Sequence, residues 1–292
     1  MKKTLYYYYW LIRTWTMRRN FPKYKILTSE ATINAIIENK MSVSRFGDGE
    51  FRLIMKERDI VFQNLKNGIS ERLLEVLNSS LQNHLVALPL SFKTTKGLKQ
   101  DSKVHWLHFI NCYGAKFSPF IYDKSKTYGN AFISRFYIDY KDHSKAETTV
   151  LNLKKIWNRK DVLIVEGVFS RLGVGNNLFD NATTLKRILC PAEHAFDRYD
   201  EILSLAKQHG ENKLILIALG PTATVLAHDL AQLNYWAIDI GHVDVEYMWM
   251  LQKATKKVPI KGRYVSEAKS IKDYDILEEF KKTYEESILH KM

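Results

Sequence analysis

Residues that staple or interrupt a fold are scarce in this sequence. Only two cysteines occur among 292 residues, Cys112 and Cys190, and they are far apart and outside any Cys-x-x-Cys pair. This excludes a disulfide framework and a zinc knuckle, and a reducing cytosol is the expected compartment. The six prolines are scattered, so no Pro-rich linker divides the chain. Because 46% of the residues are hydrophobic, the chain can bury a full core, which excludes a disordered tail.

Long apolar runs are lacking as well. The aromatic and aliphatic stretch at residues 5–12 is ended after eight residues by Arg13, whereas a membrane-spanning helix needs about 20. No small-residue cleavage site follows this stretch, so a signal peptide is not expected. The first acidic residue is Glu30, and seven basic residues precede it. We therefore expect a basic aromatic N-terminal segment over residues 1–25 and a single domain over residues 26–292 with a helical C-terminal tail.

The N-terminal segment has two interpretations. Tyr and Trp beside Arg and Lys favour the lipid headgroup layer, which predicts a cytoplasmic protein held at the inner face of the cell membrane by anionic lipid. The alternative is an aromatic helix that packs on its own domain or on a second subunit in a homodimer. Because seven of the +12 net charges lie in this segment, the remaining charge is too modest to predict a nucleic acid partner.

The apolar pattern predicts an α/β fold. Val-, Ile- and Leu-rich runs alternate with helical periodicity, which is typical of a Rossmann-like, mostly parallel sheet with helices on both faces. The expected strands are residues 42–46, 85–88, 161–165, 213–219 and 236–240, and the expected helices are residues 28–40, 71–81, 197–208 and 222–233. In such sheets ligands bind at the carboxyl ends of the strands, so the loops there are the places to search for chemistry.

The first of these loops contains two carboxylates. Asp48 and Glu50 follow the strand predicted at residues 42–46, with glycines on both sides of Asp48. A sharp turn there offers carboxylate oxygens to one hard divalent cation, Mn²⁺ or Mg²⁺, which completes its shell with water and substrate phosphates. An Asp-x-Glu tripeptide is common by chance, and a solvated turn is the alternative.

Several blocks in order resemble a known family. The stretch Arg45-Phe46-Gly47-Asp48-Gly49-Glu50 resembles the metal motif of the bacterial GT-D fold glycosyltransferases. Later blocks of that family are matched at residues 165–167, 170–179, 188–193, 218–223 and 239–247. The resemblance covers about residues 26–251, and several long blocks in order are far more specific than one tripeptide.

The resemblance implies a metal-dependent, hexosyltransferase-like enzyme. Its donor would be a nucleotide diphosphate sugar, expected to be a UDP-sugar, and its acceptor a glycan or lipid-linked glycan of bacterial surface polysaccharide or glycoprotein. Asp48 and Glu50 would hold the cation and the diphosphate, and Arg45, Phe46 and Gly47 would belong to the donor site. A divalent cation there would stabilise the charge that develops on the leaving nucleoside diphosphate.

Two further loops carry candidate donor-binding residues. In residues 170–179, Gly173 and Gly175 allow close backbone approach, Arg171 suits a phosphate, and Asn176 and Asn177 suit sugar hydroxyls; a plain strand-to-strand loop is the alternative. At the next loop, Gly220 and Thr222 flank a proline at the start of a helix, where free N–H groups suit a phosphate. A well-capped helix without a ligand explains the same residues.

A general base is expected after the strand predicted at residues 236–240. His242, Asp244 and Glu246 gather there, and a transfer with inversion needs a group that takes the acceptor's proton, with the two carboxylates preferred. The alternative places both carboxylates on the polar side of a helix. His105 and His108 have no third ligand nearby and are interpreted as surface or core histidines.

Two other function classes remain open. Asp48 and Glu50 also suit a metal-dependent phosphohydrolase, although such enzymes usually use more carboxylates or histidines for a second metal. The basic charge also suits a nucleic-acid-binding module, which the concentration of that charge before residue 26 disfavours. The alternating charges over residues 269–291 are interpreted as a solvated helix face.

Overall fold

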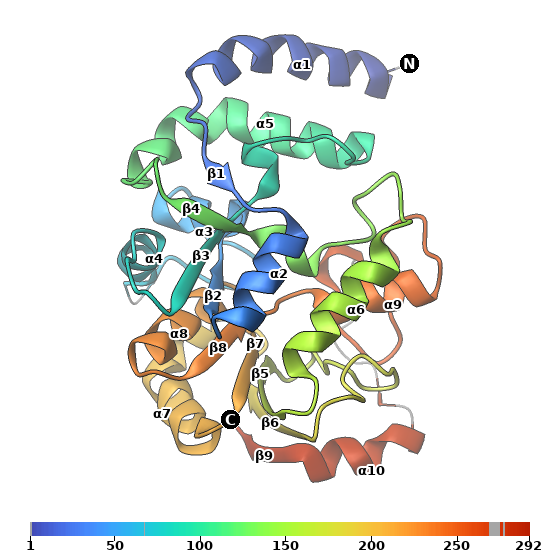
Figure 1. Ribbon diagram of the computed structural model, residues 1–292. Coiled ribbons are helices and arrows are strands. Elements are labelled where there is room, and N and C mark those ends of the chain that lie inside the picture. Colours follow the sequence, from blue (N-terminus) through green and yellow to red (C-terminus); the bar gives the residue numbers. More distant parts are fainter. Residues whose placement is uncertain (1, 67, 269–274, 277) are drawn as a thin grey trace.

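A computed structural model describes residues 2–66, 68–268, 275–276 and 278–292. Within these residues the core is one nine-stranded sheet in the order β1-β4-β3-β2-β8-β7-β5-β6-β9 (Figure 1). Every pairing is parallel. The strands are β1 (Lys25–Ile26), β2 (Ser42–Arg45), β3 (His84–Leu88), β4 (Thr127–Asn130), β5 (Asp161–Gly167), β6 (Thr184–Cys190), β7 (Leu214–Ala218), β8 (Trp236–Asp239) and β9 (Ile288–Lys291).

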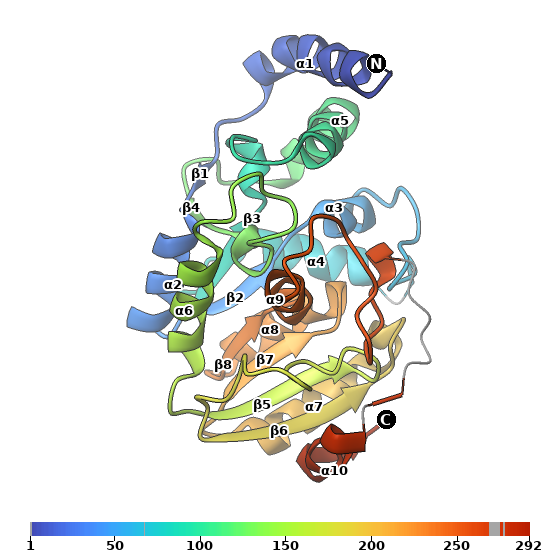
Figure 2. The same ribbon diagram turned by 90° about the vertical axis from the view of Figure 1, so that its right-hand side faces the viewer.

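Helices connect the strands and cover the sheet (Figure 2). The α-helices are α1 (Lys2–Asn20), α2 (Ser29–Glu38), α3 (Asp48–Ile54), α4 (Ile69–Leu77), α5 (Gln100–Phe117), α6 (Ala146–Trp157), α7 (Tyr199–Gly210), α8 (Pro221–Gln232), α9 (Val243–Leu251) and α10 (Glu278–Ser287). The short 3-10 helices are η1 (Leu90–Phe92), η2 (Ser118–Phe120), η3 (Ala131–Ser134), η4 (Ala195–Arg198) and η5 (Ser266–Ala268).

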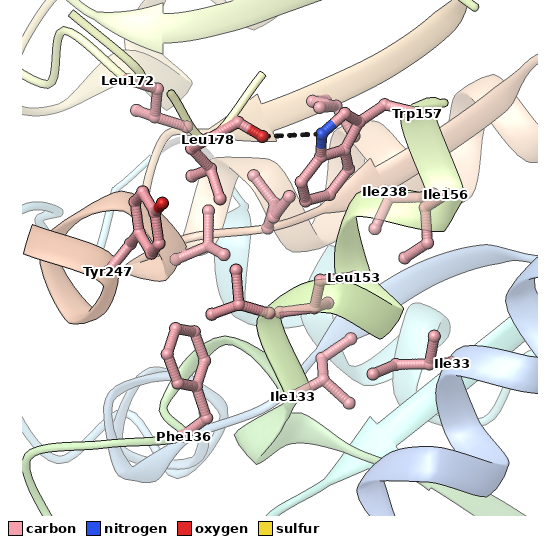
Figure 3. Packing of buried hydrophobic residues seen from close by; sticks show 14 of the residues in the cluster. Ile33, Ile133, Phe136, Leu153, Ile156, Trp157, Leu172, Leu178, Ile238 and Tyr247 are labelled. Carbon is pink, nitrogen blue, oxygen red and sulfur yellow. Dashed lines mark hydrogen bonds between the residues drawn. The ribbon is translucent and has the colours of Figure 1, made fainter. Parts of the chain in front are cut away.

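The helices lie on both faces of the sheet, as the apolar pattern predicts. In β5, Val162 and Ile164 pack with α2, α6 and α9, whereas Leu163 and Val165 pack with α7 and α8. Successive strand residues point to opposite faces, so this alternation places the two helical layers on opposite sides. The first layer includes Trp157, whose indole N–H donates to the carbonyl of Leu178 at 2.9 Å (Figure 3). The predicted α/β class and the mostly parallel sheet are confirmed.

Most predicted elements form with small shifts in their ends. Thr28 caps α2 by accepting a hydrogen bond from the N–H of Ala31 at 3.1 Å. The helix predicted to reach residue 81 ends instead at Leu77, because Asn78 folds back and its side chain donates to the carbonyl of Leu74 at 3.0 Å. The glycine before Asp48 begins helix α3 rather than an open turn.

Four strands, β1, β4, β6 and β9, were not expected from the sequence. Each has polar or small residues that hide the apolar pattern, as in β6, where Lys186 and Arg187 occupy the middle of the strand. Helix α10 agrees with the helix expected in residues 269–291, but Ile288–Lys291 joins the sheet beside β6. Residues 269–274 and 277 of that expectation lie outside the described residues.

Helix α1 lies at one end of the molecule, against α5 (Figure 1). Trp10 is buried there, with its ring centroid 4.6 Å from that of His108. Other apolar side chains of α1 stay open to solvent, including Tyr8 at 57% and Ile12 at 71% exposure. Among the described helices, none is both long and apolar enough to cross a bilayer.

Candidate active site

A cavity of about 850 Å³ opens at the carboxyl ends of the strands. Its lining includes residues that follow β2 and β8, which are neighbours in the sheet although 190 or more residues separate their ends along the chain. The chain leaves β2 toward β3 on one side, and β8 is flanked by β7 on the other, so the strand order changes direction at this point. Parallel α/β sheets bind ligands at such a point because the diverging loops leave a crevice.

Asp48 and Glu50 line this cavity on the first turn of α3. Gly47 precedes the helix, and its N–H donates to Oε2 of Glu50 at 2.7 Å. This contact fixes one oxygen of Glu50 at the start of the helix. The predicted loop thus brings both carboxylates of the Asp-x-Glu motif to one cavity.

The site holds an excess of negative charge. Burial, with smaller contributions from Asp239 and Asp48, raises the pKa of Glu50 to about 7. Burial also acts on Asp48, but the hydrogen bond and charge of His105 and the charge of Arg52 outweigh it and lower the pKa of that carboxyl. The His105 Nε2 lies 3.5 Å from Oδ2 of Asp48. A bound cation would relieve the repulsion among these carboxylates.

The side chain of Arg45 extends from the last residue of β2 to the last residue of β8. Its guanidinium donates to the Asp239 carboxylate at 2.8 Å and to the Asp239 carbonyl at 2.9 Å. It also donates to the hydroxyl of Ser134 at 2.6 Å. Arg45 therefore lines the cavity, as expected, but its donors are directed toward protein acceptors. Phe46, also expected at the donor site, lines the cavity while its ring packs 5.9 Å from Phe51.

The loop between β5 and β6 is held by contacts within the protein. The N–H of Gly173 and the side chain of Asn176 both donate to Oδ1 of Asp244 at 2.8 Å. Arg171 donates to the carbonyl of Gly262 at 2.8 Å, and Asn177 accepts from the hydroxyl of Tyr247.

These contacts position the loop. Gly173 and Gly175 have φ of +76° and +72°, as expected for a loop that needs glycine. The predicted donor residues of this loop are not among the described residues that line the cavity. The residues of this region that do line it are Gly167, Phe169, Ser170 and Leu172.

Gly220 lines the cavity at the start of α8, and Thr222 does not. Pro221 occupies the first helical position, as predicted. The Thr222 hydroxyl is fully buried and lies 3.5 Å from Oε1 of Gln63. Gly220 lies in an unusual conformation with φ of +54°, and a Cβ there would sit 3.4 Å from Phe62.

The three candidate bases lie in different surroundings. Glu246 is fully buried, and its Oε2 accepts from the N–H groups of Tyr137 and Ile138 at 2.8 and 2.9 Å. Asp244 is buried in an ion pair with Arg263. Of the three, His242 and Asp244 line the cavity, and the His242 side chain keeps 26% of its surface exposed. Both carboxylates therefore lie inside the fold, and the helix face on which they lie is not solvated.

The sequence did not predict a pair of charged residues, Arg135 and Glu267, that lies beside His242. Arg135, which follows β4, donates to Glu267 at 2.6 Å, and Glu267 lies 3.3 Å from Nε2 of His242. Burial opposes ionisation of Glu267, but the charges of Arg135, His242 and Lys257 hold its pKa well below the usual range. Prediction of strand β4 would have pointed to Arg135, because the loop after each predicted strand is a candidate ligand site.

The chain resembles known proteins over most of its length. The family model described as "Glycosyltransferase GT-D fold" matches residues 43–268. The chain belongs to this family. A solved structure described as a highly conserved domain of unknown function 1792 with a distinct glycosyltransferase fold superposes with a TM-score of 0.89 at 37% identity, covering 95% of this chain and 99% of that chain. The GT-D resemblance noted in the sequence blocks is therefore confirmed.

Two relatives with curated descriptions are streptococcal. A probable glycosyl transferase Gly of Streptococcus gordonii is 37% identical over 243 residues, which are 83% of this chain and 35% of that protein. The glycosyltransferase GlyD of Streptococcus pneumoniae is 35% identical over 265 residues, 89% of this chain and 31% of that protein. The chain thus spans about a third of the length of these relatives. A glycosyltransferase structure from Streptococcus sanguinis has a TM-score of 0.86 at 36% identity, covering 92% of this chain and all of that one.

Proposed function

We propose that this GT-D chain transfers a sugar from a nucleoside diphosphate donor, with UDP as the nucleotide, to a hydroxyl of a glycan. The observation that carries the proposal is the pair Asp48 and Glu50 in the cavity between β2 and β8. The acceptor would be a growing or lipid-linked glycan of bacterial surface polysaccharide or glycoprotein.

The two carboxylates fit a divalent cation, Mn²⁺ or Mg²⁺. Hard cations take carboxylate oxygens, and Mg²⁺ is commonly bound by one or two carboxylates together with substrate phosphates. The raised pKa of Glu50 reflects, after burial, the negative charges of Asp48 and Asp239, which a cation would offset. The cation would supply charge stabilisation to the leaving diphosphate. Asp48 and Glu50 would hold it, and His105 would keep Asp48 oriented and ionised.

His242 is the residue that we propose as proton acceptor. It lines the cavity with 26% of its side chain exposed, whereas Asp244 is engaged by Arg263 and Glu246 is fully buried. As the bond between the sugar and the diphosphate breaks, the acceptor oxygen bonds to the sugar and its proton moves to the ring nitrogen. Asp244 and Glu246 hold the loops on either side, through Gly173 and Tyr137.

The composition of the N-terminal helix favours binding of the protein to a membrane surface. Exposed side chains of α1 such as Tyr6, Tyr8 and Ile12 offer aromatic and aliphatic area, and the segment carries seven basic residues. Basic residues near an anionic surface contribute about 1 kcal/mol each. We propose that this segment binds anionic lipid at the cytoplasmic face, close to lipid-linked acceptors. The alternative is that these side chains of α1 contact a second copy of the chain.

A ligand screen tests the catalytic proposal. The melting temperature is measured with a panel of nucleoside diphosphates and their sugars, with Mn²⁺, Mg²⁺ or excess chelator, because a ligand that binds only the folded chain raises it. Metal-dependent stabilisation by UDP, together with slow release of UDP from a UDP-sugar, is the expected result. Release of inorganic phosphate would favour a phosphohydrolase, and a screen without any nucleotide response would contradict the proposal.

A further inference from the structure

The cavity has two chemically different ends. At one end lie the loops after β5, β6 and β7 together with the side chains of Phe62, Phe169 and Tyr264. The rings of Phe62 and Tyr264 are 6.4 Å apart. Among the described residues that line this end, here called the uncharged end, the charge of Asp244 is balanced by its ion pair with Arg263, and the others carry none.

The other end, here called the α5 end, is rich in polar and charged groups. It is lined by Lys99, Asp101, Ser102, His105, Trp106, Arg135, Asp139, Tyr140, Lys256, Lys257 and Glu267. These residues come from the start of α5, the loop after β4 and the segment that follows α9. The order of the strands puts this end on the far side of Asp48 and Glu50 from the uncharged end.

Trp106 differs from three other tryptophans of the chain. Trp157, Trp236 and Trp249 each donate their indole N–H to a backbone carbonyl, at 2.9 to 3.1 Å. Within the described residues, no acceptor is recorded for the N–H of Trp106, which lines the cavity half-buried. Because Trp106 is only half-buried at the cavity wall, its N–H can donate to a ligand bound there.

Trp106 is also held rigidly. Its ring lies 5.4 Å from that of Phe132 and 6.0 Å from that of Phe92, both of which are buried. The side chain therefore presents a fixed aromatic surface to the cavity, and binding a ligand there costs little side-chain entropy.

Tyr140 repeats this pattern on the facing loop. Its side chain lines the cavity and packs over Gly97, with 3.7 Å between a ring carbon and the position of a Cβ on that glycine. Its hydroxyl, too, has no hydrogen-bond partner recorded among the described residues, whereas the neighbouring Asp139 accepts from Ser102 at 2.7 Å and lies 3.6 Å from Lys257. The α5 end thus combines two aromatic donors with a polar wall that is already ordered.

We propose that the α5 end binds the acceptor saccharide, with Trp106 and Tyr140 as its recognition residues; this inference rests on the proposed sugar transfer. Their ring faces pack on the C–H groups of a sugar, and their N–H and O–H groups donate to its hydroxyls. During transfer the acceptor and the leaving diphosphate extend from the same sugar carbon in different directions. A diphosphate at Asp48 and Glu50 with its nucleoside toward the uncharged end leaves the α5 end to the acceptor.

Conservative variants test this assignment. Trp106→Phe and Tyr140→Phe each remove one donor and keep an aromatic ring. The probes are p-nitrophenyl glycosides of glucose, galactose and N-acetylglucosamine, titrated calorimetrically into protein loaded with UDP and Mn²⁺. Each variant should weaken binding of the tightest glycoside about three- to tenfold, the effect of one hydrogen bond, and leave UDP affinity within about twofold. Trp236→Phe and Tyr235→Phe, at the amino end of β8 and outside the cavity lining, are the matched controls.

The outcomes separate this inference from the proposed function. If UDP binds but no glycoside does, or if both variants bind glycosides as the wild type does, the α5 end is not the acceptor site. If glycoside binding depends on Trp106 and Tyr140 while UDP neither binds nor is released from UDP-sugars, the saccharide site stands and the proposed transfer fails. A melting temperature within about 3 °C of wild type shows that each variant is folded.

Discussion

The guanidinium of Arg45 and the carboxylate of Asp239 form an ion pair, with 2.8 Å between Nη2 and Oδ1, at the point where β2 and β8 meet. Both side chains are largely buried, at 14% and 5% exposure. Burial raises the pKa of Asp239 despite the nearby positive charge of Arg45. The pair joins two loops of the site that are 194 residues apart in sequence.

Gly241→Ala should disrupt this ion pair. A Cβ at Gly241 would lie 1.8 Å from Nη2 of Arg45, and Arg45 could move away only by leaving Asp239. Breaking a buried pair costs about 3–5 kcal/mol of unfolding free energy, and the φ of +44° adds about 1 kcal/mol. Urea denaturation measures the loss. Gly262→Ala is the control, since its φ is +80° but its nearest neighbouring atom is 3.8 Å away, so about 1 kcal/mol is expected there. Equal losses in the two variants would contradict this account.

Asp48→Asn and Glu50→Gln should each abolish metal-dependent transfer. The amides keep the shape of the side chains but lose the charge that holds a cation. We expect the stabilisation by UDP with Mn²⁺ to disappear in thermal melts while the melting temperature of the free protein changes little. Asp200→Asn, on the exposed surface of α7, should behave as wild type. Near-normal transfer by either variant, or by wild type in excess chelator, would refute the metal role.

His242→Gln should lower turnover by about 10²- to 10⁴-fold, the usual effect of losing a general base. UDP binding should persist, because the proton transfer does not involve the nucleotide. The same assay on Asp244→Asn and Glu246→Gln compares the three candidates of the stretch after β8. Normal turnover by His242→Gln would show that His242 is not the base.

Glu246 should make stability depend on pH. Burial raises its pKa from 4.5 to about 7, so the folded chain binds a proton that the unfolded chain has already released between those values. Stability should therefore be highest below about pH 4.5 for this group and fall as the pH rises to about 7. In Glu246→Gln the fall should shrink by on the order of 2–3 kcal/mol, measured by urea denaturation at pH 5 and 8. An identical pH profile in both proteins would exclude this role.

Truncation of the chain to start at Ile26 tests the membrane proposal. The full chain should sediment with vesicles that contain anionic phosphatidylglycerol, less so at high salt because ions screen the attraction. The truncated chain should remain in the supernatant, and neutral phosphatidylcholine vesicles are the control. A change of oligomeric mass on truncation, with no change in vesicle binding, would assign α1 to a dimer contact.

The sequence by itself determined the layered fold and one part of the site. The apolar runs of β5, β7 and β8 predict buried parallel strands, since side chains on both faces of such strands must be apolar. Asp48 and Glu50 were found because they follow a strand directly and lie two residues apart, so local geometry brings them to one place. Strands with polar residues, such as β6, were not predicted from the sequence. In β6 the charged Arg187 is buried beside Glu166, so the strand lacks the apolar pattern of a buried strand.

Only the tertiary structure decided the rest of the site. His105 of α5 reaches Asp48 of α3 because these two helices pack together, and spacing within α5 carries no sign of that contact. Asp244 is engaged by Arg263, and Glu246 by the N–H groups after β4, so the role of a carboxylate near a strand end depends on partners from distant segments. Sequence patterns report which face of a helix or strand is buried, whereas the distance between two loops depends on how the whole sheet is ordered and twisted.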